Sequence, residues 1–167
     1  MANAAKLLIA PAAFLLTAAN QILMPRMATL RVSNIQRMYK MNNFMAVFFI
    51  LFAISYTLLL FLVSDSFFTF IIGNNYEDIK PLVLTWCLVL VFQFSRASTT
   101  VVLQVMKAFR RIMLDNLLSA LVAIVIAVVL LQMMGVQGAI IGTAFGELIL
   151  SIFLYRSVRL YKLQSYL

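Results

Sequence analysis

Residues 117–131 read LLSALVAIVIAVVLL, an apolar run interrupted by a single serine. With its flanks, residues 112–134, the run is long enough to cross a bilayer core of about 30 Å as an α-helix. Arg110 and Arg111 precede it and Gly135 follows it. Basic residues at one end and a turn-forming glycine at the other are typical of the boundaries of a membrane span.

Four more segments have a similar length and composition, so the sequence predicts an all-α integral membrane protein. The five predicted spans are residues 4–24, 44–63, 81–106, 112–134 and 138–155. Of the 167 residues, 65% are apolar and only 11% are charged, which is more hydrophobic surface than a water-soluble domain of this size can bury. We expect one transmembrane helical domain over residues 1–167 and no second domain.

The basic residues predict the orientation of the spans. Ten of the thirteen lysines and arginines fall in the first, third and last polar segments, and the two segments between these hold almost none. Because lysine and arginine are enriched in cytoplasmic loops, this pattern predicts an N-terminus outside and a C-terminus inside. The ten residues are Arg26, Arg31, Arg37, Lys40, Lys107, Arg110, Arg111, Arg156, Arg159 and Lys162.

Composition also argues against several classes of function. The net charge of +8 lies almost wholly beside the predicted spans, where it attracts anionic membrane lipids, and no soluble segment presents a basic surface to nucleic acid. The chain has no histidine, the most common metal ligand and general base, and its polar segments are too short to form an aqueous active site. We therefore expect no enzyme activity, no metal and no cofactor.

The third predicted span carries a row of polar residues. Their spacing of three, four and four residues puts them on one face of a helix. Arg96 stands near the middle of the span, where a charge costs on the order of 3 kcal/mol on insertion scales. Two interpretations stay open: Arg96 bonds to carbonyls or to a carboxylate inside the bundle, or it faces a polar pathway. This polar row consists of Gln93, Arg96, Thr100 and Gln104.

The fifth predicted span carries a glycine row and a carboxylate. Gly138, Gly142 and Gly146 recur at every fourth residue and predict a groove into which a neighbouring helix packs. Glu147 lies on the next row of the same helix, near mid-depth. Its carboxyl group can be protonated and silent, can pair with Arg96, or can exchange protons as an ion-coupling group. The sequence contains no distance between the spans and does not choose among these.

The first predicted span is polar in its cytoplasmic half. Thr17, Asn20 and Gln21 form a cluster there, and Pro25 and Arg26 follow it.

Three short motifs, taken in order, resemble a known family. Residues 20–26 read NQILMPR, residues 71–76 read IIGNNY, and residues 135–144 read GVQGAIIGTA, with Glu147 following. Their order and spacing over residues 3–159 resemble the C-terminal lobe of the lipid-linked oligosaccharide flippases. These are the O-antigen and exopolysaccharide branch of the multidrug/oligosaccharidyl-lipid/polysaccharide exporter superfamily.

The resemblance implies a function in the bacterial inner membrane. Flippases of this family move an undecaprenyl-pyrophosphate-linked oligosaccharide to the outer leaflet by alternating access of two lobes, about twelve helices in all, around a cationic cavity. The five spans would then be spans eight to twelve, and an N-terminal transporter half is expected as a partner. The polar row led by Arg96 is expected to line the substrate pathway, because a guanidinium group holds phosphate oxygens bidentately. Glu147 is expected to couple ions.

Two other functions stay open. A drug or organic-cation exporter of the same superfamily would need a lumen dominated by carboxylates and aromatic residues, whereas the mid-membrane charges here are one arginine and one glutamate. A small non-transporting subunit would use the glycine row as a scaffold for a membrane partner.

Overall fold

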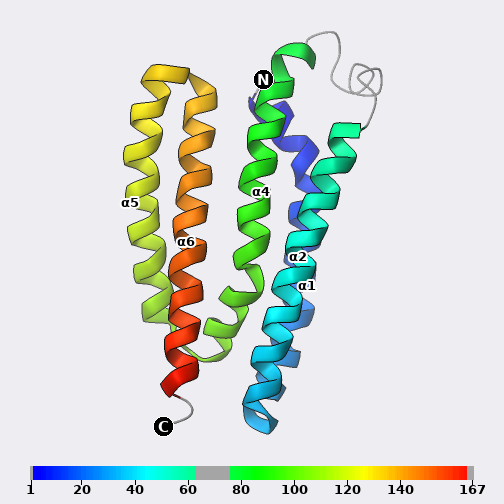
Figure 1. The fold of residues 1–167 in the computed structure, drawn as a ribbon, viewed down its shortest axis with the longest axis vertical. Helices are drawn as coiled ribbons and strands as arrows, with labels where there is room; N and C mark the ends of the chain where they lie inside the picture. The colour runs from blue at the N-terminus through cyan, green and yellow to red at the C-terminus, as the bar shows by residue number, and fades with distance from the viewer. Residues whose placement is uncertain (1, 63–75, 165–167) are drawn as a thin grey trace.

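The chain forms a bundle of long α-helices. The computed structural model describes residues 2–62 and 76–164, with side chains described for residues 9–62 and 81–163. Within these ranges every element is helical (Figure 1), which confirms the all-α prediction for the described residues. The helices are α1 (Ala2–Ser33), α2 (Ile35–Leu62), α4 (Tyr76–Val105), α5 (Phe109–Met134) and α6 (Val136–Gln164).

Four of these helices, α2, α4, α5 and α6, are long and apolar enough to cross a membrane. They indicate a multi-pass membrane protein, in agreement with the composition. The described part of α1 is not among the four, because Asn20, Gln21 and Arg26 lower its mean hydropathy. A membrane crossing by α1 therefore stays a prediction. The motif at residues 71–76 lies almost wholly outside the described residues.

The helices are longer than the predicted spans, mainly at one end of the bundle. α1 continues to Ser33, α2 already begins at Ile35, and α6 continues to Gln164. The predicted spans stop at the first charged side chains. A helix does not stop there, because lysine and arginine are good helix formers and the ends of a long helix can stand outside the hydrocarbon core.

The helices alternate in direction, so the basic segments gather at one end. The C-terminal ends of α1, α4 and α6 and the N-terminal ends of α2 and α5 lie together at the lower end in Figure 1, which we call the basic end. Nine of the ten basic residues assigned to cytoplasmic segments lie in the halves of the helices that reach this end, and Lys107 lies in the turn between α4 and α5. The bundle therefore has the separation of charge that a positive-inside arrangement requires.

α4 is the central helix of the bundle. It packs against α1, α2 and α6. Of the residues in its apolar membrane-spanning segment, 56% are buried, compared with 6% for α5. Phe94 of α4 stacks on Phe52 of α2, with ring centroids 5.6 Å apart, and meets Phe49 edge-on at 6.1 Å. Because α5 packs chiefly against α6, most of its apolar surface is left to lipid or to another membrane-embedded surface.

Helix ends at the basic end are capped by identifiable groups. Lys107 adopts a φ of 60° after α4, and the backbone hydrogen bonds around it form a Schellman turn. Arg31 of α1 donates from Nη1 to the carbonyl of Val105 at 2.5 Å, so a cation satisfies one of the last carbonyls of α4. Asn34 caps α2 by accepting the N–H of Arg37 at 2.9 Å.

α5 and α6 are joined by polar contacts at the basic end. Asp115 of α5 is only 2% exposed. Its Oδ2 accepts the hydroxyl of Ser157 of α6 at 2.8 Å, and its Oδ1 lies 3.3 Å from Nε of Arg111. Since each polar group of this small network is partnered, the network ties the two helices together without leaving a buried charge unpaired.

The glycine row of α6 faces α5 at close range. A Cβ atom on Gly142 would lie 2.5 Å from Cα and 2.6 Å from the backbone nitrogen of Ala127. A Cβ atom on Gly146 would meet Cβ of Ala123 at 2.5 Å, but its next neighbours lie at 3.5 Å or beyond. Both glycines therefore allow a helix approach that a side chain would prevent, through backbone at one position and through a single methyl group at the other.

This difference predicts which glycine substitution can be rescued. Gly146→Ala should lower the free energy of unfolding by about 1 to 3 kcal/mol through overpacking, and adding Ala123→Gly should recover most of the loss because only a methyl group is in the way. The control pair, Gly142→Ala with Ala127→Gly, should not recover, since the backbone of Ala127 stays in place. Denaturant titration in detergent micelles measures both, and equal rescue of the two pairs would contradict the packing.

Candidate functional site: a polar cavity beside an ion pair

Arg96 of α4 and Glu147 of α6 form an ion pair inside the bundle. Nε of Arg96 donates to Oε2 of Glu147 at 2.5 Å, and Nη2 donates to Oε1 at 3.2 Å. Nε2 of Gln93 donates to the same Oε1 at 3.1 Å. The side chains of Arg96 and Glu147 are 25% and 14% exposed. In so sheltered a place each charge depends on the other for compensation.

Of the alternatives left open for Glu147, the structure shows the pair with Arg96. The sequence places each residue on one face of its own helix, but the distance between the two faces depends on how α4 and α6 pack. Ser151 of α6 lies at the contact between α4 and α6, because its hydroxyl lies 3.2 Å from the hydroxyl of Ser95 and 3.2 Å from the carbonyl oxygen of Phe92. Small hydroxyl side chains let the two helices approach and hold the pair in register.

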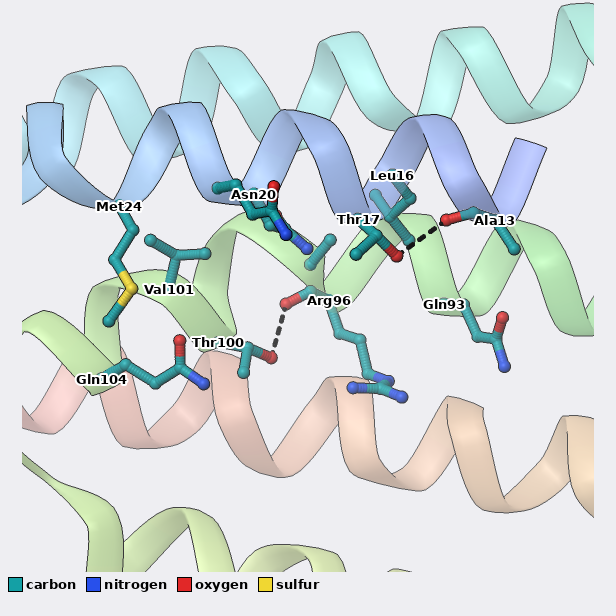
Figure 2. A pocket seen from close by; sticks show the side chains of 12 residues that line it. Ala13, Leu16, Thr17, Asn20, Met24, Gln93, Arg96, Thr100, Val101 and Gln104 are labelled. Carbon is teal, nitrogen blue, oxygen red and sulfur yellow. Dashed lines mark hydrogen bonds between the residues drawn. The ribbon is translucent and has the colours of Figure 1, made fainter. Parts of the chain in front are cut away.

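The polar row also lines a cavity between α1 and α4. The cavity has a volume of about 450 Å³, within the range of small-ligand sites. Figure 2 shows Gln93, Arg96, Thr100 and Gln104 on one side of α4, and Arg96 and Gln93 reach Glu147 of α6. All four members of the polar row contribute to its wall. The residue paired with Glu147 is therefore also part of a polar cavity, so the two interpretations of Arg96 are not exclusive.

The opposite wall of this α1–α4 cavity comes from the polar cluster of α1. Thr17, Asn20 and Gln21 all line it. Oδ1 of Asn20 is buried and has no hydrogen-bond partner within the described protein. A buried acceptor without a donor is costly, so a hydroxyl or N–H group of a ligand would be stabilised there. The sequence shows this cluster but not what it faces, because nothing in it relates α1 to α4.

The cavity continues into a more apolar one toward the other end of the bundle. This second cavity has a volume of about 460 Å³ and shares Ala13, Thr17 and Gln93 with the first. Its remaining wall is mostly apolar: Ile9, Ala10, Phe14, Trp86, Val89, Leu90 and Thr143. We call these two adjoining cavities the groove along α4; its lining is more polar toward the basic end and more apolar beyond it.

A small cavity of about 190 Å³ lies on the other side of the ion pair, among α4, α5 and α6. Glu147 lines this cavity and not the α1–α4 cavity, whereas Arg96 lines both. Asn116 and Ser119 of α5 add polar groups to its wall. Arg96 thus lies between the α1–α4 cavity, which is large enough for a small ligand, and the carboxylate of Glu147.

The ion pair predicts a strong coupling of the two substitutions. Arg96→Ala or Glu147→Ala alone should each lower the free energy of unfolding by about 3 kcal/mol, because each leaves one sheltered charge without its partner. The double variant should lose clearly less than the sum. Arg110→Ala, an exposed position at the basic end, is the control and should change the value by about 0.5 kcal/mol or less. Strictly additive losses in a double-mutant cycle would contradict the pair.

The described residues contain no group of three or more histidine, cysteine, aspartate or glutamate side chains arranged to hold a metal ion. A scan against protein-family models, a search of curated proteins and a search of solved structures found no match to this chain. The α1–α4 cavity, its apolar continuation and the Arg96–Glu147 pair are thus the features from which a function can be inferred.

Proposed function

We propose that this chain is part of a membrane transporter that moves a phosphate-linked, hydroxyl-rich lipid across the membrane. Undecaprenyl-pyrophosphate-linked oligosaccharide, the substrate implied by the resemblance, belongs to this class. The observation that carries the proposal is the groove along α4, polar at one end and apolar at the other. An amphiphile matches such a groove, because its headgroup and its chain require the two environments that the groove joins.

The side chains of the polar half suit a phosphorylated headgroup. A guanidinium group stays charged, tolerates incomplete hydration and can hold two phosphate oxygens at once. The amides of Asn20, Gln21 and Gln104 and the hydroxyl of Thr100 surround the same space and offer donors and acceptors for sugar hydroxyls.

In this proposal Arg96 has two alternative anionic partners, the carboxylate of Glu147 and a phosphate group of the ligand. Without a ligand, the carboxylate neutralises the guanidinium. A phosphate group in the α1–α4 cavity would approach Arg96 from the side opposite Glu147 and compete for it. A carboxylate released in this way would take up a proton or a cation, because a lone charge at membrane depth is costly. This exchange is the proposed means of ion coupling by Glu147.

The proposed orientation places the basic end in the cytoplasm of a bacterial cell, with α1 as a fifth span. The polar half of the groove then opens toward the cytoplasmic side, where a lipid-linked sugar would enter. Alternating access requires a second lobe that rocks against this one, and the exposed apolar surfaces of α2 and α5 leave room for contact with it.

The two alternatives receive less support. Among the described residues, the wall of the α1–α4 cavity contains an arginine and no carboxylate, which disfavours an organic cation as the ligand. The glycine row, which a scaffold would present to a partner, is already covered by α5 through Ala127 and Ala123.

A charge swap separates transport from folding. Fused to the N-terminal lobe of an oligosaccharide flippase in a flippase-deficient strain, the unaltered chain should restore surface polysaccharide. Arg96→Glu combined with Glu147→Arg keeps an ion pair and should keep protein abundance. It should lower export by about tenfold or more, since the cation leaves the helix that lines the cavity and a charge-assisted bond to phosphate is worth roughly 1.5 to 3 kcal/mol.

Two further variants sharpen this test. Asn20→Leu should lower export at normal abundance, because it removes a cavity acceptor that has no partner within the described protein. Arg110→Gln, an exposed change at the basic end, should leave export unchanged. Normal export by the charge-swap variant would rule out the role of Arg96, and no export by the unaltered fusion would contradict the proposed function itself.

A further inference from the structure

A separate cavity opens at the basic end between α2 and α6, over α4. It has a volume of about 290 Å³ and shares no lining residue with the two cavities between α1 and α4. The residues that line this α2–α6 cavity are Tyr39, Asn42, Asn43, Thr99, Tyr155, Val158, Arg159 and Lys162.

Thr99 differs from every other threonine that the structure describes. The hydroxyl groups of the others donate to the backbone carbonyl four residues earlier, as threonine commonly does inside a helix. Thr99 is 0% exposed, and its Oγ1 has no hydrogen-bond partner within the described protein. Its hydroxyl does not make the hydrogen bond to the carbonyl four residues earlier that the other threonines make. A buried hydroxyl without a partner is unusual and requires a physical reason.

Asn42, on the facing helix α2, has the same feature as Thr99. It is 2% exposed, and its Oδ1 also has no hydrogen-bond partner within the described protein. Asn42 and Thr99 come from α2 and α4, and both line the α2–α6 cavity. Two buried oxygen acceptors without donors therefore belong to the wall of a single space, and a ligand with hydroxyl groups would supply both donors.

Two cations complete the wall nearer the end of the bundle. Arg159 and Lys162 come from the last turns of α6, and Nζ of Lys162 lies 5.8 Å from the centroid of the Tyr39 ring. None of the described residues that line the cavity is acidic. The described wall of the cavity thus contributes two positive charges, which favours an anion.

Depth and surroundings favour a lipid as the source of that anion. Asn42 and Thr99 lie about two turns from the ends of their helices, roughly 10 Å inside at a rise of 1.5 Å per residue, and Lys162 lies close to the end. Headgroups meet acyl chains at such a depth. Beyond the cavity, exposed apolar side chains continue along both helices, at Val47 on α2 and Ile152 on α6, where acyl chains would lie.

We infer that the α2–α6 cavity binds the headgroup of an anionic phospholipid that carries both a phosphate and hydroxyl groups. Arg159 and Lys162 hold the phosphate, and the hydroxyls donate to Oδ1 of Asn42 and Oγ1 of Thr99. Phosphatidylglycerol is the simplest lipid with this chemistry. The inference depends on the membrane location of the bundle and not on transport, because no residue of the proposed substrate pathway takes part.

Lipid binding to the purified, delipidated chain in detergent tests the inference. Native mass spectrometry would follow titration with phosphatidylglycerol and with phosphatidylcholine of the same acyl chains, and we expect about tenfold preference for phosphatidylglycerol. Thr99→Val should weaken phosphatidylglycerol binding by about fivefold, the effect of one hydrogen bond, while the thermal unfolding midpoint of the lipid-free protein stays equal or rises. A variant that had only damaged the fold would lower that midpoint.

Charge-matched variants distinguish a site from general attraction. Arg159→Gln with Lys162→Gln should lose the preference for phosphatidylglycerol, whereas Arg110→Gln with Arg156→Gln removes the same charge at exposed positions of the same end and should keep it. Thr57→Val, which removes a hydroxyl bonded to the carbonyl of Ala53, is the matched control for Thr99→Val and should leave binding unchanged.

Three outcomes would overturn the inference. Equal binding of the two lipids would remove the role of the cations. Equal loss in the two charge-matched pairs would reduce the effect to general attraction. Release of phosphatidylglycerol by inorganic phosphate at millimolar concentration would assign the cavity to a soluble phosphate compound instead of a lipid.

Discussion

The ion pair between Arg96 and Glu147 constrains the rest of the bundle. Neither charge is tolerable alone at this depth, so α4 and α6 must meet in the one register that joins Nε of Arg96 to Oε2 of Glu147 at 2.5 Å. In this register the hydroxyl of Ser151 reaches the carbonyl oxygen of Phe92. The glycine row on α6 then allows α5 to pack closely against α6. With α4 held in this way, its remaining faces receive α1 and α2, and a cavity lies beside each of these contacts.

The position of the pair also links structure to the proposed function. A guanidinium group that served only to neutralise a carboxylate would not need to line a cavity of about 450 Å³ whose wall also holds amide and hydroxyl side chains. Arg96 occupies the boundary between this cavity and Glu147, so a phosphate ligand and the carboxylate would compete for one cation. In the proposed function, such competition would give a direct route from ligand binding to a change in α6, because releasing Glu147 would alter the interaction that sets the helix register.

The parts of the structure that could be predicted from the sequence are those set by local patterns. Apolar runs such as residues 117–131 predict helices because length and composition suffice, and the spacing of the polar row predicts its shared face. Contacts between helices could not be predicted: the pairing of Arg96 with Glu147 and the facing of Asn20 toward the polar row depend on tertiary packing. Thr99 carries no signal in the sequence, since the neighbouring Thr100 has the same side chain and bonds normally to its own helix. The predicted spans are shorter than the helices because charged residues end a hydrophobic run without ending a helix.

The central claim, that the polar row faces an aqueous cavity open toward the basic end, is tested most directly by cysteine accessibility. In a Cys87→Ala background, single cysteines at Ser33, Thr100 and Val125 would be exposed to a small, membrane-impermeant thiol reagent in inside-out vesicles. We predict that Ser33→Cys and Thr100→Cys react, the latter more slowly because it lies inside the cavity, and that Val125→Cys on the apolar face of α5 does not. A cysteine at Thr100 as unreactive as one at Val125 would contradict the account.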